Sequence, residues 1–160
     1  MKRILLSSLV ALVVGAGVTG LVIVESMPGM MIVTRPSRLG FEETVQAIQE
    51  GIEAEGWSSP GTINMNKSMA AHGVTLEPQV RLIQLCKAEY AKRVLETDRY
   101  VASLMPCAMA VYEGDDGRVY VSKMNTGLMG KLFGGTIAEV MGGQVAEDEH
   151  AILEGVVSEE

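Results

Sequence analysis

The sequence predicts an α+β fold: a small mixed sheet packed with helices on one side, preceded by one N-terminal transmembrane helix. Three observations predict it. A hydrophobic fraction of 48% over 160 residues is enough for one core, an uncharged run opens the chain, and strand-like and helix-like patterns alternate after that run. Only 4% of the residues are aromatic and 11 are methionine, so the predicted core is aliphatic and methionine-rich.

The first predicted element is a membrane anchor at residues 4–24. This run contains no charged residue and, at about 1.5 Å per residue, can cross the roughly 30 Å of hydrocarbon in a bilayer. Lys2 and Arg3 precede it and Glu25 follows it, so the positive-inside bias places the N-terminus in the cytoplasm. We therefore expect a single-pass protein of the bacterial inner membrane, with its remaining residues in the periplasm.

A cleaved signal peptide is the alternative interpretation of the same segment. It would share the basic start, but its apolar core usually has only about 7–15 residues and ends in a small-x-small cleavage site. Here the apolar run is longer and no convincing Ala-x-Ala site follows it. An uncleaved anchor is favoured, and both interpretations deliver the domain to the same compartment.

The remaining chain predicts one folded domain. The full division is a cytoplasmic stub (1–3), the transmembrane anchor (4–24), a connector with the first strand (25–38), the folded domain (39–155) and an acidic tail (156–160). The formal net charge is −7, whereas nucleic-acid domains need clustered Lys and Arg to displace counterions. Nucleic acid is therefore not expected as a partner.

The first half of the domain predicts two strands and three helices. Residues 31–35 are short and β-branched and stop at Pro36, as in a strand. A helix follows, with apolar residues at helical spacing and Gly56 placed to end it: Phe41, Val45, Ile48 and Ile52. Residues 63–73 predict a further helical turn, residues 80–86 a buried strand, and residues 88–97 another helix.

The second half predicts a β-hairpin and then helices. Residues 107–113 and 118–122 are strand-like, and the sequence GDDG at 114–117 is a typical turn between them. Two adjacent apolar stripes run through residues 128–141, so almost half of that helical surface is hydrophobic. His150 lies among Glu147, Asp148 and Glu149, and we expect this acidic stretch to be solvated.

Three ordered segments carry a family resemblance. They are CKAEYA at 86–91, MPCAMAVYE at 105–113 and GRVYV at 117–121. Together they resemble the bacterial and archaeal family called domain of unknown function 302, over about residues 33–153. MNTGLM at 124–129 with Phe133 and Gly134 resembles a subset that often follows an N-terminal anchor or signal. The resemblance implies a compact α+β domain that tends to self-associate, and it implies no established reaction.

The two cysteines leave two possibilities open. Cys86 ends one predicted strand and Cys107 begins another. In an oxidising compartment they could form a structural disulfide, worth very roughly 3 kcal/mol by loop entropy. If they lie close but unbonded, they become a candidate redox or sulfur-carrier pair, although no Lys-rich patch or clear helix N-terminus near them lowers a thiol pKa.

Methionine, cysteine and histidine also form a pool of soft ligands for Cu(I) or a non-covalent haem. The ligand candidates, which would join Cys86 and Cys107, are Met65, Met69, His72, Met105, Met124 and Met129. A covalent c-type haem is excluded because Cys-x-x-Cys-His is absent. The competing interpretation is that these methionines simply fill the core.

These patterns predict a non-catalytic binding or assembly domain, with a thiol redox protein as the alternative. A wide apolar face either seals the domain's own sheet or becomes an interface, and we expect a homo-oligomer. The interface candidates are Gly130, Leu132, Phe133, Gly134 and Ile137. A hydrolase has little support, because the sequence has no Gly-x-Ser-x-Gly, no glycine-rich phosphate loop and only two histidines.

Overall fold

A computed structural model of the chain describes residues 15, 27 and 29–158. The chain divides into two compact units, Met1–Met31 and Ile32–Glu160, and the second is the folded domain. Within the described part of the chain, no helix is both long and apolar enough to cross a bilayer. The predicted anchor at residues 4–24 lies outside the described residues except for Gly15, so it stays a prediction.

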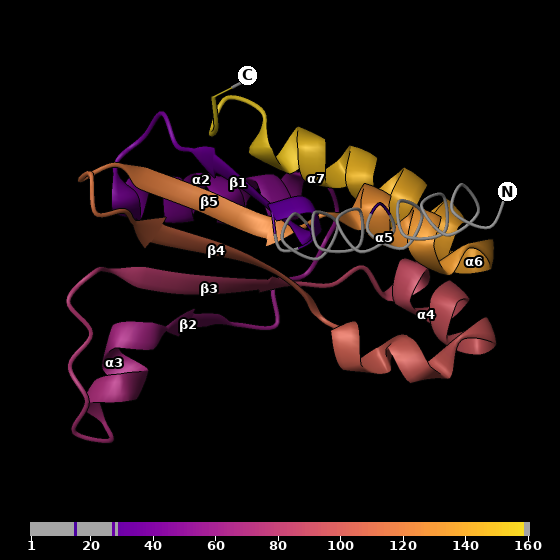
Figure 1. Ribbon diagram of the computed structural model, residues 1–160, viewed down its shortest axis with the longest axis horizontal. Helices are drawn as coiled ribbons and strands as arrows, with labels where there is room; N and C mark the ends of the chain where they lie inside the picture. The colour runs from indigo at the N-terminus through magenta and orange to yellow at the C-terminus, as the bar shows by residue number, and fades with distance from the viewer. Residues whose placement is uncertain (1–14, 16–26, 28, 159–160) are drawn as a thin grey trace, which may run out of the picture. The chain divides into compact units, whose positions relative to one another are not determined.

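The domain is built on one five-stranded sheet in the order β1-β5-β4-β3-β2 (Figure 1). Its strands are β1 (Ile32–Pro36), β2 (Thr62–Asn64), β3 (Val80–Leu85), β4 (Cys107–Glu113) and β5 (Val119–Met124). All four pairings are antiparallel, so the α+β class is confirmed and the predicted mixed sheet is wrong. Parallel neighbours need a helix crossing over the sheet, whereas the helices after β2 and β3 lie beyond the strand ends (Figure 1).

Helical segments make up most of the remaining domain. They are α2 (Phe41–Ala54), α3 (Met65–Ala70), α4 (Ala88–Thr97), the 3₁₀-helix η1 (Arg99–Leu104), α5 (Thr126–Phe133), α6 (Gly135–Glu139), the π-helix η2 (Val140–Val145) and α7 (Ala146–Leu153). Of these, α2 packs against β3, β4 and α7. The helix predicted from Phe41 and the helix at 88–97 are both confirmed.

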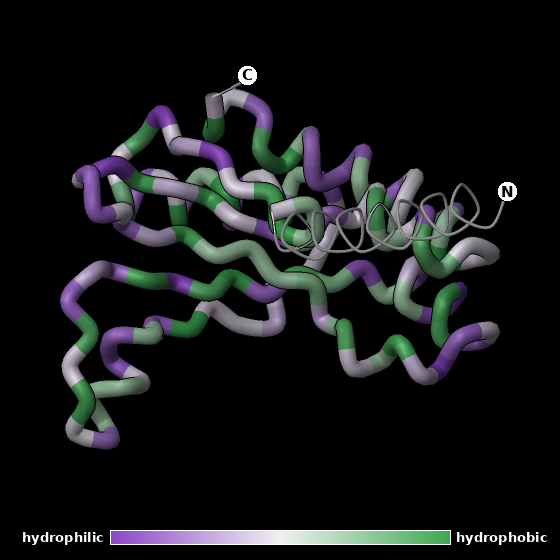
Figure 2. The backbone as a smooth tube through the Cα atoms, in the orientation of Figure 1, coloured by the Kyte–Doolittle hydropathy of each residue, from purple (hydrophilic) through white to green (hydrophobic). Residues whose placement is uncertain are grey.

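The core lies between α2, α7 and one face of the sheet. Side chains alternate between the faces of a strand, so every second residue reaches this core. The buried strand residues are Ile83, Leu85, Met109, Val111 and Val121. From α2 they meet Val45, Ile48 and Ile52, which the helical spacing predicted, and α7 adds Ile152 and Leu153. In α7 the hydrophilic residues come first and the hydrophobic residues gather at its C-terminal end, where Ile152 and Leu153 reach the core (Figure 2).

The segment predicted as a helix at 63–73 is instead a short strand followed by a short helix. Thr62–Asn64 pairs with β3, and α3 begins immediately afterwards. The Oδ1 atom of Asn64 accepts a hydrogen bond from the backbone N of Lys67 at 3.0 Å, which caps the helix. Three strand residues are too few to produce a period-two pattern, so β2 was missed.

The C-terminal third is helical, as predicted, but it is broken rather than continuous. Gly134 and Gly135 adopt φ values of 70° and 52°, which separate α5 from α6. Residues with side chains rarely adopt these angles, so glycine is required at the break. The two apolar stripes over residues 128–141 therefore do not form one helical face. The helices that carry them fold back on each other, with α5 packing against both α6 and η2.

Candidate functional site

Three of the predicted ligand residues meet at one end of the sheet. Met105 follows η1, Met124 ends β5 and Met129 lies in α5. They line one cavity of about 20 Å³ together with Met141 of η2. We call these four residues the methionine cluster. Met129 is almost fully buried, and the other three are partly buried.

The close approach of two helical segments builds this end of the domain. A Cβ atom added at Gly130 of α5 would lie 2.8 Å from the Cα of Gly142 in η2, which is closer than real side chains come. Asn125 caps α5 through a hydrogen bond from the backbone N of Leu128 to its Oδ1, at 3.0 Å. These two features fix where α5 starts and how near it lies to η2, and so bring Met129 towards Met141.

The other three ligand candidates lie at the opposite end of the sheet, near α3 (Figure 1). Met65 and Met69 are half-buried, and His72 is exposed in the turn that follows the helix. None of the three lines the cavity of the methionine cluster. The structure therefore divides the predicted ligand pool into two groups.

The two cysteines lie near each other and are both free thiols. Cys107 opens β4 opposite Leu85, and Cys86 directly follows Leu85 in the chain. Both cysteines line a second small cavity of about 30 Å³, beside Trp57 and Tyr90. The arrangement brings together the two sulfur atoms that the sequence analysis singled out.

The surroundings of Cys107 keep its thiol protonated. Burial raises its pKa to about 12, with a further contribution from the negative charge of Glu149 and only a partial offset from Lys123. A thiolate, and not a thiol, is the nucleophile and the redox-active form. At neutral pH the Cys107 sulfur is therefore poorly suited to thiol exchange.

The carboxylate of Glu149 is buried, contrary to the expectation of a solvated acidic stretch. Its side chain is 2% exposed, and its Oε2 atom accepts hydrogen bonds from Lys123 Nζ at 2.6 Å and from Thr126 Oγ1 at 2.9 Å. The sequence signal was present but weak: Val145 at the end of η2 lies at helical spacing from Glu149 and Ile152 of α7. Both flanking residues are buried, so Glu149 lies on the core side and needs a partner.

Asp148 also forms hydrogen bonds within the domain, contrary to the expected solvated stretch. Its Oδ2 atom accepts hydrogen bonds from Lys87 Nζ at 2.8 Å and from Trp57 Nε1 at 2.9 Å. Burial raises the pKa of Asp148, but the two hydrogen bonds outweigh burial and the net pKa lies below the ordinary value. The hydrogen bond to Asp148 in turn raises the pKa of Lys87, against the opposing effect of burial. This ion pair ties α7 to the start of α4.

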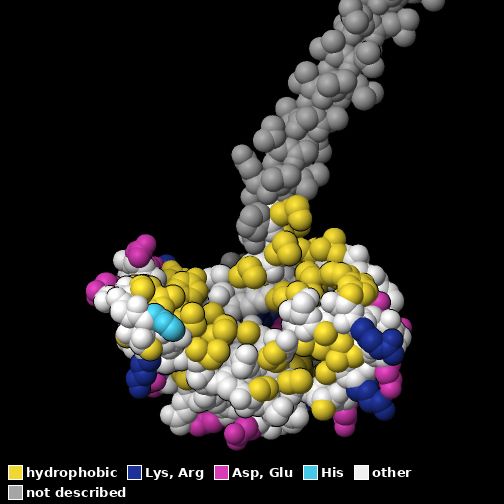
Figure 3. All heavy atoms as spheres, turned by 90° about the horizontal axis from the view of Figure 1, so that it is seen from below, with side chains coloured by type: hydrophobic (Ala, Val, Ile, Leu, Met, Phe, Trp, Pro, Cys, Tyr) yellow, Lys and Arg dark blue, Asp and Glu magenta, His cyan; other side chains and the backbone are white. Residues whose placement is uncertain are grey.

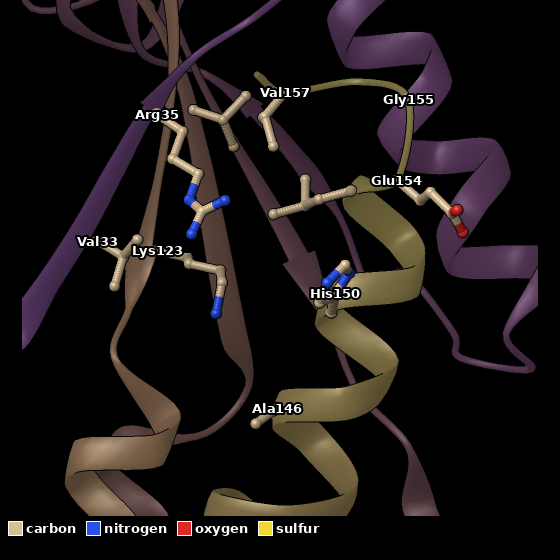
Figure 4. A pocket seen from close by; sticks show the side chains of 10 residues that line it. Val33, Arg35, Lys123, Ala146, His150, Glu154, Gly155 and Val157 are labelled. Atoms are coloured by element: carbon tan, nitrogen blue, oxygen red, sulfur yellow. The ribbon is translucent and has the colours of Figure 1, made fainter. Parts of the chain in front are cut away.

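A separate, larger cavity of about 230 Å³ lies between β1, β5 and α7. Its polar lining residues are Arg35, Lys123, His150 and Glu154, and the first three extend towards the cavity from three different elements (Figure 4). The carboxylate of Glu154 points away from it (Figure 4). We call this space the basic cavity. Arg35 and Lys123 were not predicted as site residues, because their meeting depends on the pairing of β1 with β5.

Comparison with known proteins identifies the family. Residues 33–157 match the family model described as "Domain of unknown function DUF302". The chain belongs to the DUF302 family. A crystal structure of an uncharacterized conserved DUF302 protein from Bacillus stearothermophilus superposes with a TM-score of 0.69 and 17% sequence identity, covering 79% of this chain and 98% of that chain. At this identity the likeness shows the fold alone, and the comparison with curated proteins gives no match.

Classical metal ligands are not grouped in this DUF302 domain. Among the residues that the structure describes, no three His, Cys, Asp or Glu side chains are placed to hold one ion. Thioether sulfur is a further donor for soft metal ions. The methionine cluster is where several predicted thioether ligands line one cavity.

The predicted interface residues of the DUF302 domain fall into two sets. Gly130 and Ile137 are buried inside the domain, and Gly134 forms the break after α5. Leu132 and Phe133 are exposed, with 62% and 41% of their surface accessible. On the face shown in Figure 3, hydrophobic side chains spread over the middle, and charged side chains lie mostly around the edge of the view. Exposed apolar surface is therefore available for a contact.

Proposed function

We propose that this chain is a non-catalytic binding domain held at a bacterial inner membrane, and that it binds a soft metal ion, Cu(I), through its methionine cluster. The observation that carries the proposal is the convergence of Met105, Met124 and Met129 on one small cavity. These residues belong to separate segments of the chain, and Met141 of η2 adds a fourth thioether, while the remaining lining is apolar. Local helical spacing alone cannot produce this arrangement.

The chemistry and size of the cavity select the ligand. Thioether sulfur is a soft donor that suits Cu(I), and it can also ligate haem iron. The volume of about 20 Å³ is close to what a single water molecule occupies. A porphyrin needs a pocket on the order of several hundred Å³. The cavity therefore favours a bare ion over the non-covalent haem that the sequence also allowed.

The location in the membrane is part of the proposal. An uncharged run at residues 4–24 behind Lys2 and Arg3 supports an anchor with a cytoplasmic N-terminus. The DUF302 domain then faces the periplasm. We also expect the domain to form a homo-oligomer, for which Leu132 and Phe133 offer exposed apolar surface.

A thiol redox or sulfur-carrier protein is the second candidate function. The shared cavity of Cys86 and Cys107 favours it, because a redox pair must lie close together. The pKa of Cys107, raised to about 12, counts against it because almost no thiolate forms at neutral pH. We therefore rank this function below metal binding.

A Cu(I) competition titration tests the proposal. Full-length protein in non-ionic detergent would be titrated anaerobically against a chromogenic Cu(I) chelator, and we expect one ion per chain. Met105→Leu removes one thioether while nearly keeping the side-chain volume, and should weaken Cu(I) binding at least about tenfold. The matched control is Met69→Leu in α3, which should leave the affinity unchanged.

The proposal fails if the protein takes up no Cu(I), or if both leucine variants lose affinity equally. A methionine-to-leucine change in a core usually costs less than about 1.5 kcal/mol, so both variants are expected to fold. Thermal unfolding would verify this. Met124→Leu provides a second test at a partly buried position of the same cluster, and it too should weaken binding.

A further inference from the structure

The basic cavity is a second site, distinct from the methionine cluster. It opens between β1, β5 and α7 and has a volume of about 230 Å³. The cavity of the methionine cluster shares the strand β5 with it, but no lining residue is common to the two cavities. The two cavities therefore allow independent ligands.

Arg35 is an exposed residue of the edge strand β1. It pairs in register with Val121, whose side chain is buried, so the alternation along β1 directs Arg35 to the face that α7 covers. The backbone of Arg35 belongs to the ladder with β5, but its guanidinium makes no hydrogen bond or ion pair with the described part of the chain. Its guanidinium extends towards the cavity (Figure 4). An unpaired guanidinium beside a cavity is available to an anionic ligand.

The neighbouring charges leave the cavity suited to an anion. Lys123 also lines it, but its ammonium is already paired with the buried carboxylate of Glu149 at 2.6 Å. The carboxylate of Glu154 points away from the cavity (Figure 4), and His150 faces in from α7. Arg35 therefore supplies the uncompensated positive charge.

The rest of the lining is apolar. Val33, Val121, Leu153 and Val157 come from β1, β5, α7 and the segment after α7. A small, strongly hydrated anion such as phosphate would lose its water against these side chains without gaining enough partners in return. A molecule with one anionic end and a hydrocarbon body would instead satisfy both parts of the cavity.

We propose that the basic cavity binds a small monocarboxylic acid with an apolar body, whose carboxylate pairs with the guanidinium of Arg35. The planar guanidinium matches a carboxylate with two parallel hydrogen bonds. At roughly 30 Å³ for each water-sized group, the cavity holds about eight non-hydrogen atoms. Hexanoate, with six carbons and two oxygens, has this size and is the probe we choose.

Calorimetric titration of the full chain in zwitterionic lipid nanodiscs tests this inference, with empty nanodiscs as the blank. Hexanoate should bind, whereas 1-hexanol and inorganic phosphate should bind at least about tenfold more weakly. Arg35→Gln should lower hexanoate affinity at least about tenfold, since it removes the charged donors. The matched control is Arg38→Gln, which changes an arginine that is exposed like Arg35 but does not line the cavity, and should have no effect.

A second pair of variants tests the cavity itself while keeping Arg35. Ala146 lines the cavity from α7, so Ala146→Leu should fill part of the space and weaken hexanoate binding at least about fivefold. Ala151→Leu makes the same change on the same helix at an exposed residue outside the cavity, and should not affect binding.

Three results would each overturn the inference. The first is the absence of hexanoate binding to the wild-type chain. The second is equal binding of 1-hexanol or of phosphate, which would identify a purely apolar pocket or a simple anion site. The third is unchanged hexanoate affinity in both Arg35→Gln and Ala146→Leu. The Cu(I) titration is separate, so either site can fail without affecting the other.

Discussion

The two ends of the sheet carry the same residue type in different surroundings. At one end, Met65 and Met69 lie on the six-residue helix α3, which buries none of its residues. At the other end, Met105, Met124 and Met129 line one cavity. The difference lies in how the helices pack: α3 is a single short helix, whereas α5 and η2 pack closely against each other.

This contrast shows which methionines can act together. Residues that share a helical face lie close along one element, but a cavity that holds an ion needs donors from several directions. At one end, the close approach of Gly130 to Gly142 holds α5 beside η2, so that methionines of both segments line the same cavity. The α3 end has no comparable packing among its described residues, since α3 contacts only β2 and β3 extensively.

The largest expected effect comes from truncating a methionine at each end. Met129→Ala should lower the free energy of unfolding by about 3 kcal/mol, because it leaves a cavity where the side chain is 6% exposed. Met69→Ala should lower it by less than about 1 kcal/mol, since Met69 is only half-buried. Urea unfolding measures both. Equal losses would show that the two ends are equally packed and would contradict the difference in packing described above.

The next effect concerns the glycine contact that builds the methionine end. Gly130→Ala should cost about 2 kcal/mol or more, because the added methyl would lie 2.8 Å from backbone of Gly142, which cannot move aside as a side chain can. Gly127→Ala on the same helix meets only Asn125 Oδ1, at 3.6 Å, and should be neutral or slightly stabilising. A Gly130→Ala variant as stable as wild type in urea unfolding would contradict the close approach.

The ion pairs at the two ends should also differ in how much they contribute to stability. The Lys87–Asp148 pair has side chains 21% and 18% exposed, whereas in the Arg81–Glu42 pair the carboxylate is 71% exposed. We expect Asp148→Asn to cost about 1.5 kcal/mol at pH 7 and Glu42→Gln less than about 0.5 kcal/mol. Comparable costs in urea unfolding would argue against this difference in burial.

The same pair gives a pH dependence with a definite sign. The pKa of Asp148 is lower in the folded chain than in the unfolded one, so the folded state releases that proton more readily. Its contribution to stability is present above about pH 4 and is lost as the pH falls below that value. Between pH 3 and pH 6, the free energy of unfolding should therefore change less with pH for Asp148→Asn than for wild type.

The smallest effect on stability, but a clear one on reactivity, is expected at Cys107. In a Cys86→Ser variant, alkylation of Cys107 by iodoacetamide at pH 7.5 should be at least about 100-fold slower in the folded chain than in urea, because its pKa is raised to about 12. Above about pH 8.5 the unfolded thiol ionises and the folded one does not, so stability should fall with rising pH. Rapid alkylation of the folded chain would contradict this expectation and support the thiol redox function instead.

Local patterns in the sequence predicted the elements with strong periodicity. The spacing of Phe41, Val45, Ile48 and Ile52 predicted α2, and the GDDG turn predicted the hairpin of β4 and β5. The three-residue strand β2 and the break at Gly134 and Gly135 were not predicted. They depend on pairing with β3 and on positive φ angles, which leave no periodic signal.

The candidate sites were predictable by residue type and not by position. The six soft-ligand candidates included Met105, Met124 and Met129, but nothing in their spacing separated them from the three near α3. The basic cavity was missed because Arg35, Lys123 and His150 meet only through strand pairing and the packing of α7. Non-local contacts decide both sites, and a single sequence does not encode such contacts as a local pattern.

The most direct test of Cu(I) binding by the methionine cluster is X-ray absorption at the copper edge on full-length protein in which every methionine is selenomethionine. If the cluster holds the ion, the spectrum should contain copper–selenium scattering from two or three neighbours, which should be reduced in Met105→Leu and unchanged in Met69→Leu. A spectrum with only sulfur, nitrogen or oxygen neighbours would contradict the account, because the copper would then be bound by other groups.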